Sequence, residues 1–407
     1  MTATRRDFLK TVCGASTLMA LSPAVPEFLL RASQAAAPDP EGRQTALVVV
    51  QLSGGNDGLN TVVPYTNDAY GRGRTTLRLT GKDVHKIDDE LGFHPSMERT
   101  LRLFRDGQLS VVQGVGYPNS NRNHDDALRD WHTARPGEIA CQTGWLGRAM
   151  DAVSDPNRPS TPGVCVAPLP KPVLMNAEAT VAPTVTSASQ YVLRDLPQSA
   201  SVEGNSENPL VGFVSRGLAV SYASSRQVQD VLKDSGNRVQ YPAYPLAEQL
   251  KTVVELVRAK LGIRMFFTEL GGGGIGGFDN HANQRDNHAA VLHELSESLA
   301  AFSDDLRHYK LQDDVLLMTF SEFGRTLREN GRRGTDHGAA APVLLVGGRL
   351  RGGLVGKHPS LTDLDGDSPR HHTDYRELYA TILDQWLGMP SQKVLGKQYK
   401  HIEIVRG

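Results

Sequence analysis

Residues 315 to 346 place polar side chains between two segments that have the character of buried strands. The segment Val315–Phe320 is apolar apart from one threonine, and a second apolar segment follows at Pro342–Val346. Between them lie the sequences Ser-Glu-Phe-Gly-Arg-Thr and Gly-Thr-Asp-His-Gly. Short apolar runs are typical of strands buried on both faces, and open α/β sheets bind ligands at the ends of their strands. The stretch therefore predicts an α/β fold with a site at a strand edge.

The Asp336-His337 pair in this stretch offers one carboxylate and one imidazole with little steric cover, because glycines flank it. Such a pair suits a divalent metal of the zinc or manganese type. Arg325, in the preceding polar segment, could hold a tetrahedral anion. A simpler interpretation is a turn in which Asp336 caps a helix and His337 binds nothing.

The first 37 residues are predicted to be a twin-arginine signal peptide and no part of the fold. Arg5 and Arg6 precede Phe8 and Leu9, a weakly apolar stretch follows, and small residues near 32–37 suit cleavage. The alternative is an amino-terminal helix that stays in place. The signal predicts passage through the twin-arginine translocation machinery in folded form, to the periplasm or outside the cell. The apolar stretch is shorter than the roughly 18 uninterrupted residues of a membrane span.

The remaining residues, 38–407, are expected to form a single α/β domain with a loop-rich, substrate-facing insertion at about 137–208. The net charge of -1 argues against a nucleic-acid partner. Cys141 and Cys165 could form a disulfide or stay as two free thiols. The absence of a Cys-x-x-Cys motif argues against a thiolate metal site.

Two further predicted strands also end in polar loops. The first, Ala46–Leu52, is followed by Asp57, although an Asn-Asp-Gly turn would equally explain that residue. The second, Ile263–Leu270, is followed by a glycine-rich loop that contains Asp279 and His281. These two could converge on one metal or occupy its inner and outer shells. Alternatively, Asp279 caps the next helix and His281 faces solvent.

The predicted strand Leu109–Val115 follows a predicted helix at 95–106, and together with the first strand they suggest a βαβ pattern. After it comes a loop with Ser120, the nearest hydroxyl that could attack a phosphorus or sulfur centre. Alternatively, Ser120 and Asn123 only cap the following helix. His124 could be a metal ligand, an anion donor or a surface histidine.

Two more segments complete the expectations. Thr75–Thr80 is predicted to be an edge strand. His372 precedes a helix that runs to about Trp386, and it could be the imidazole of a second metal site. Thr373 or Asp374 would cap that helix.

Together these residues offer carboxylate and imidazole ligands, which suit zinc or manganese better than magnesium or calcium. One or two ions could be bound, and a pair could orient an attacking oxygen and neutralise a leaving one.

The chain resembles the bacterial family called domain of unknown function 1501. The resemblance covers almost all of it and is carried by VVVQLSGGNDGLNTVVPY, GVGYPN, GGFDNHANQ, FSEFGRT, GTDHG and TDYRELYATIL. That family is in turn similar to the alkaline phosphatase and sulfatase superfamily, which implies a mostly parallel sheet with helices on both faces. By that resemblance Asp57 and Asp336-His337 match one metal position. Asp279 and His281 match the other, with His372 as the candidate third ligand.

The sequence departs from the superfamily pattern in two ways. Asp279 and His281 are two residues apart where four is usual, and no Cys-x-Pro-x-Arg or Ser-x-Pro-x-Arg run is present. The resemblance still implies an exported metal-dependent hydrolase of phosphate or sulfate esters, small or polysaccharide, whose nucleophile is a side chain or metal-bound water. The alternative is a non-catalytic envelope protein of the same fold that binds a polysaccharide or a protein partner.

Overall fold

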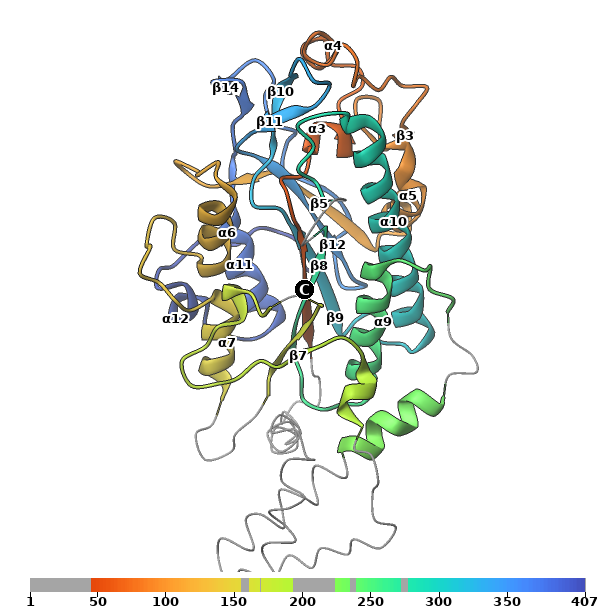
Figure 1. The fold of residues 1–407 in the computed structure, drawn as a ribbon, viewed down its shortest axis with the longest axis vertical. Coiled ribbons are helices and arrows are strands. Elements are labelled where there is room, and N and C mark those ends of the chain that lie inside the picture. Colours follow the sequence, from red (N-terminus) through yellow and green to blue (C-terminus); the bar gives the residue numbers. More distant parts are fainter. Residues whose placement is uncertain are drawn as a thin grey trace, which may run out of the picture.

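One central sheet gathers strands from the whole length of the chain (Figure 1). The computed structural model describes residues 45–154, 161–168, 170–192, 224–234, 239–271 and 277–406, so the predicted signal peptide lies outside it. Along the sheet the strands are β13 (Gly353–Val355), β5 (Leu109–Gly116), β12 (Ala341–Val346), β9 (Val315–Phe320), β1 (Ala46–Leu52), β8 (Met265–Leu270), β6 (Gly163–Val166) and β7 (Thr184–Val185), with β16 (Thr373–Asp374) pairing with β5.

The sheet is mostly parallel, as predicted. Strand β1 runs parallel to β8 and β9, β6 runs parallel to β8 and β7, and β12 is antiparallel to both of its neighbours. In the register of the central strands, Leu52 pairs with Leu270, and Gln51 pairs with Phe320. The carboxyl ends of β1, β8 and β9 therefore lie at the same edge, and the loops that follow them meet there.

Helices cover both faces of the sheet because its central strands alternate between two apolar cores (Figure 1). Val48 and Val50 face one core, whereas Leu47 and Val49 face the other. The first core is closed by α5 (Glu98–Arg105), α9 (Pro245–Arg258) and α10 (Gln284–His308), and the second by α6 (His124–Thr133), α7 (Trp145–Val153), α11 (Tyr375–Thr381) and α12 (Ser391–Leu395). No helix of the described segments is long and apolar enough to cross a membrane.

Small elements gather beyond the carboxyl edge of the central strands (Figure 1). They are α3 (Gly58–Thr61), α4 (Asp68–Gly73), β10 (Arg325–Glu329), β11 (Thr335–His337), β14 (Leu364–Asp365) and β15 (Ser368–Pro369). The other short elements are β2 (Val62–Val63), β3 (His85–Lys86), β4 (Gly92–Phe93), 3-10 turns at Pro95–Met97, Val173–Met175 and Ala188–Tyr191, a π-helix at Ile382–Trp386 and a helix over residues 224–233.

The structure corrects two predictions about local structure. Residues 75–77 form a turn and residues 78–80 are irregular, with no strand, because the Glu329 carboxylate accepts hydrogen bonds from the Thr75 hydroxyl and from the backbone N–H groups of Thr76 and Leu77. Strand β5 does not neighbour β1, since β9 and β12 lie between them. The described part of the segment predicted as a loop-rich insertion contains α7, and its strands β6 and β7 extend the central sheet.

The structure confirms other local predictions and decides between alternatives that the sequence left open. Asn123 caps α6 and Asp374 caps α11, each through its side chain. Asp279 does not cap α10, since the residue at that position is Asn283, with a φ of 47°. Cys141 and Cys165 are both free thiols.

Three buried histidines are expected to make the fold sensitive to acid. Burial lowers the pKa of His94 from 6.5 to about 4, and those of His132 and His288 from 6.5 to about 3. Between pH 6.5 and about 4 the unfolded chain binds protons at these residues that the folded protein does not, so the free energy of unfolding falls as the pH falls. We expect a slope of about 4 kcal/mol per pH unit for the three together.

This slope can be measured by urea unfolding at several pH values between 4.5 and 7. His132→Asn should remove about a third of it, because one of three titrating groups is lost. A free energy of unfolding that stays constant down to pH 4.5 would contradict the prediction.

Candidate metal centre

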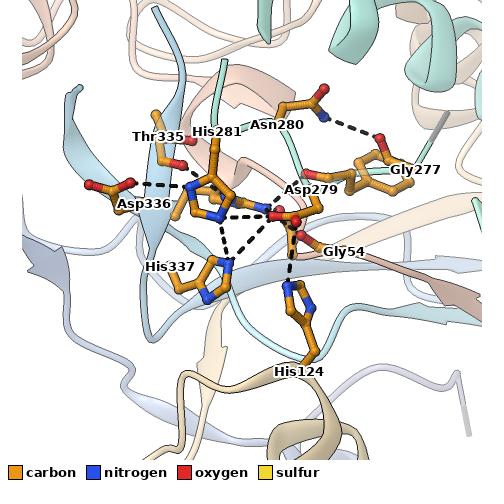
Figure 2. A network of polar contacts seen from close by, with 12 residues as sticks. Gly54, His124, Gly277, Asp279, Asn280, His281, Thr335, Asp336 and His337 are labelled. Carbon is orange, nitrogen blue, oxygen red and sulfur yellow. Dashed lines mark hydrogen bonds and ion pairs between the residues drawn. The ribbon is translucent and has the colours of Figure 1, made fainter. Parts of the chain in front are cut away.

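The carboxylate of Asp279 lies among three imidazoles at the carboxyl edge of the sheet (Figure 2). One of its oxygens is 3.0 Å from Nε2 of His281 and 3.4 Å from Nε2 of His337, and the other is 3.6 Å from Nε2 of His124. Asp279 and His281 lie in the loop after β8, His337 ends β11, and His124 begins α6. Four residues from three separate parts of the chain therefore form one cluster.

Each imidazole of this cluster is oriented by a hydrogen bond at its other nitrogen. The Nδ1 contacts are His124 with Glu322 at 2.9 Å, His281 with Asp336 at 3.1 Å, and His337 with the carbonyl oxygen of Arg122 at 2.6 Å. A carbonyl or an ionised carboxylate only accepts, so each Nδ1 donates its proton and a neutral ring keeps a lone pair at Nε2. Metal-binding histidines are held in this way.

The Nε2 atoms of His281 and His337 are only 2.9 Å apart. If both rings are neutral and both Nδ1 atoms carry the protons, two lone pairs face each other at this distance. A cation between the rings removes that repulsion, whereas a proton there would charge one of them. The ligand atoms of His124, Asp279 and His337 also all lie within 4.8 Å of one another. The residues present therefore fit a divalent metal with nitrogen and oxygen ligands.

The charges of the cluster suit the same interpretation. Burial raises the pKa of Asp279, but Arg325 and the neighbouring imidazoles together lower it by more, so this carboxyl has a pKa below its usual range. Burial lowers the pKa of His337 and favours the neutral, metal-binding form. The hydrogen bond that His124 donates to Glu322 raises the pKa of His124, which increases the basicity of the ring.

Arg325, which the sequence suggested as a group that holds an anion, has its donors engaged within the protein and positions the cluster. Its side chain is buried, and its guanidinium donates to the backbone carbonyls of Gly54, Gly55, Phe278 and Thr335 and to Asp279. The guanidinium thus connects the loops after β1 and β8 with β11. Gly54 permits this close approach, since a Cβ on it would lie 2.3 Å from the backbone nitrogen of Asp279.

Asp57 is not part of the cluster, although the sequence suggested it as a ligand. Its two oxygens accept bonds of 2.5 and 2.9 Å from Arg74, and one of them also accepts from Gln284. Arg74 is fully buried, and it also donates to the carbonyls of Thr326 and Leu327. Burial raises the pKa of Asp57, but Arg74, with His288 and Gln284, lowers it by more, so the carboxyl is paired with the charge of Arg74.

The remaining predicted site residues have other positions. His372 contacts the carbonyl of Lys357 at 2.6 Å and the hydroxyl of Thr373 at 3.0 Å, so both of its nitrogens are engaged away from the cluster. Ser120 lies in the loop before α6, from which the carbonyl of Arg122 contacts the cluster. Asp336 contacts His281 and orients it from outside.

Two groups that support the cluster were not given these roles by the sequence analysis. Glu322 follows a predicted strand, and that position was the only signal for its contact with His124. The carbonyl oxygen of Arg122 could not be identified from the sequence, because every residue has a backbone carbonyl.

The fold and the cluster define an α/β protein with a candidate divalent-metal centre at its strand ends. The chain belongs to the family described as "Protein of unknown function (DUF1501)", whose sequence profile matches residues 44–405. No protein with a curated function matches the sequence.

Several solved structures are similar to this chain at low identity. The C-terminal periplasmic domain of EcEptC from Escherichia coli, in complex with Zn, is 10% identical with a TM-score of 0.38, over 76% of this chain and 74% of that one. A protein in the alkaline phosphatase superfamily from Vibrio parahaemolyticus is 11% identical with a TM-score of 0.38, over 91% and 76%. The PsFucS1 sulfatase from Pseudoalteromonas sp. is 10% identical with a TM-score of 0.36, over 91% and 71%.

Proposed function

We propose that this protein is an exported, metal-dependent hydrolase of phosphate or sulfate esters with one divalent ion. Asp279, His281, His337 and His124 would hold the ion. The observation that carries the proposal is that all three imidazoles are fixed at Nδ1 by an oxygen and turn Nε2 towards one carboxylate. Three nitrogens and one oxygen are ligands typical of zinc, and manganese is the next choice.

One ion fits these residues better than two. A second ion beside Asp57 would have to displace Arg74, whose guanidinium is fully buried and bonded to both oxygens of that carboxylate. Removing a buried partner from such a pair costs about 3–5 kcal/mol. Arg74 therefore supplies the positive charge that a second metal would otherwise provide.

The charge of the centre supports an anionic ester as the substrate. Asp279 contributes one negative charge, and an imidazole binds a metal in its neutral form, so a bound divalent ion would keep a net positive charge. When bound, the ion would act as a Lewis acid on an ester oxygen. The chain's own residues orient the centre, because Arg325 holds Asp279 at 2.7 Å while Glu322 holds His124.

The proposal includes export through the twin-arginine pathway to the periplasm or outside the cell. Its support is the order of Arg5-Arg6, Phe8-Leu9 and the small residues near 32–37. The exported protein would then bind its substrates, small esters or esterified polysaccharides, outside the cytoplasm.

The test is elemental analysis of the exported protein purified without chelator, followed by assays with aryl phosphates and aryl sulfates. We expect about one zinc or manganese ion per chain and turnover of one ester class that stops when a chelator removes the ion. Protein that lacks stoichiometric metal would end the proposal. Bound metal without turnover of any ester would instead favour a non-catalytic binding protein of the same fold.

A further inference from the structure

A serine and a glutamate form a short hydrogen bond at the same edge of the sheet as the candidate metal centre. Ser53 follows β1, and its hydroxyl lies 2.5 Å from Oε1 of Glu269 on the neighbouring strand β8. Both side chains are partly exposed to solvent. A hydroxyl in contact with a carboxylate is the arrangement that a nucleophile and its general base require.

The surrounding contacts fix the direction of this hydrogen bond. His132, which is buried, contacts Oε1 of Gln51 at 2.7 Å, so the amide nitrogen of Gln51 points the other way. That nitrogen donates to the Ser53 oxygen at 2.7 Å and to Oε1 of Glu269 at 3.1 Å. Because Ser53 already accepts from Gln51, its own proton is directed at Glu269.

Backbone contacts place this pair next to the metal centre. The carbonyl oxygen of Ser53 accepts from the N–H of Phe278, the residue before Asp279, at 2.8 Å. The following N–H, of Gly54, donates at 2.8 Å to the Glu322 oxygen that also contacts His124. The backbone on either side of the Ser53 side chain is therefore bonded to the segment that carries Asp279 and to the carboxylate that orients His124.

We propose that Ser53 is the nucleophile of this hydrolase and Glu269 its general base, an inference that rests on the function proposed above. In the first step the Ser53 oxygen bonds to the phosphorus or sulfur and the ester bond to the leaving alcohol breaks. Glu269 takes the serine proton and passes it to the leaving oxygen. In the second step water attacks the phosphoserine or sulfoserine, Glu269 takes a proton from the water and passes it to the Ser53 oxygen, and inorganic phosphate or sulfate leaves.

The electrostatic environment favours these roles. Burial raises the pKa of Glu269, which strengthens this carboxylate as a proton acceptor. Ser120, the hydroxyl that the sequence suggested, lies on the loop before α6, whose bond to the cluster is made by the carbonyl of Arg122 and not by the Ser120 side chain. It therefore provides a matched control.

The test uses diisopropyl fluorophosphate, which phosphorylates an activated serine whether or not the natural ester is known. The Ser53 oxygen would bond to phosphorus, fluoride would leave and Glu269 would take the proton. Peptide mass spectrometry should find the adduct on Ser53 in the wild type and in Ser120→Ala. Ser53→Ala should give none, and Glu269→Gln should be labelled at least about 100-fold more slowly, because it lacks the base.

Elemental analysis of the same variants separates this inference from the proposed function. Ser53→Ala and Glu269→Gln are expected to keep their metal and to lose turnover of the aryl ester that the wild type hydrolyses. A wild type without an adduct on Ser53, or a Ser53→Ala variant that still turns over ester, would overturn the role of Ser53. Equal labelling of Glu269→Gln and wild type would overturn the role of Glu269. A wild type without metal would contradict the proposed function, whatever the labelling shows.

Discussion

Asp279→Asn is expected to abolish stoichiometric metal binding. Asp279 is the carboxylate that all three imidazole Nε2 atoms face, and it is the one charged ligand of the candidate centre. Loss of a partner one step outside a metal site lowers affinity about 10- to 100-fold, so loss of the ligand itself should exceed 100-fold. Elemental analysis after gel filtration, and zinc titration against a chromophoric chelator, would measure the change.

Asp336→Asn is the matched control for this variant. It changes a carboxylate on the same surface. Among the three imidazoles, this carboxylate contacts only that of His281, at Nδ1. We expect affinity to fall about 10- to 100-fold, with one ion still bound at saturating zinc. Equal affinities for Asp279→Asn and wild type would show that the metal, if any, is bound elsewhere.

Arg74→Met is expected to destabilise the fold by about 3–5 kcal/mol. The substitution leaves the Asp57 carboxylate buried without its counter-charge, since both of its oxygens bond to Arg74 and only Gln284 would remain. Urea unfolding followed by circular dichroism at pH 7 would measure the loss of free energy.

The double variant Asp57→Asn with Arg74→Met tests the cause of that loss. Without the buried charge it should be more stable than Arg74→Met alone. If the double variant were the less stable of the two, lost packing around Arg74 would explain the effect and the unpaired carboxylate would not.

The sequence predicted the strands of the sheet well, but not their order. Apolar runs identify β1, β5, β8, β9 and β12, because strands covered on both faces must be apolar along their length. The order of the strands depends on pairing between segments that are far apart in the sequence. Nothing within residues 46–115 indicates that β9 and β12 come between β1 and β5. The turn at residues 75–77 was missed for a similar reason, since Glu329 lies about 250 residues away in the chain.

For the candidate site, too, the sequence predicted the location but not all of the contacts. Asp279, His281 and His337 follow predicted strands or lie in loops between them, and His124 begins a helix after another strand, so their meeting at one edge could be predicted. The partners of Asp57 and Arg325 could not, because a charged side chain at a strand end looks the same in a sequence whether it faces a metal or a buried counter-charge. Arg74 belongs to no recognisable motif, and only the fold brings it to Asp57.

The buried guanidinium of Arg325 has a consequence for how an ion could enter and leave. Its bonds to four backbone carbonyls hold three peptide segments together without help from any metal. In small zinc domains the metal itself drives folding, and removing it unfolds the chain. Here the polypeptide supplies its own crosslink, so the apo form should stay folded and exchange one ion for another reversibly.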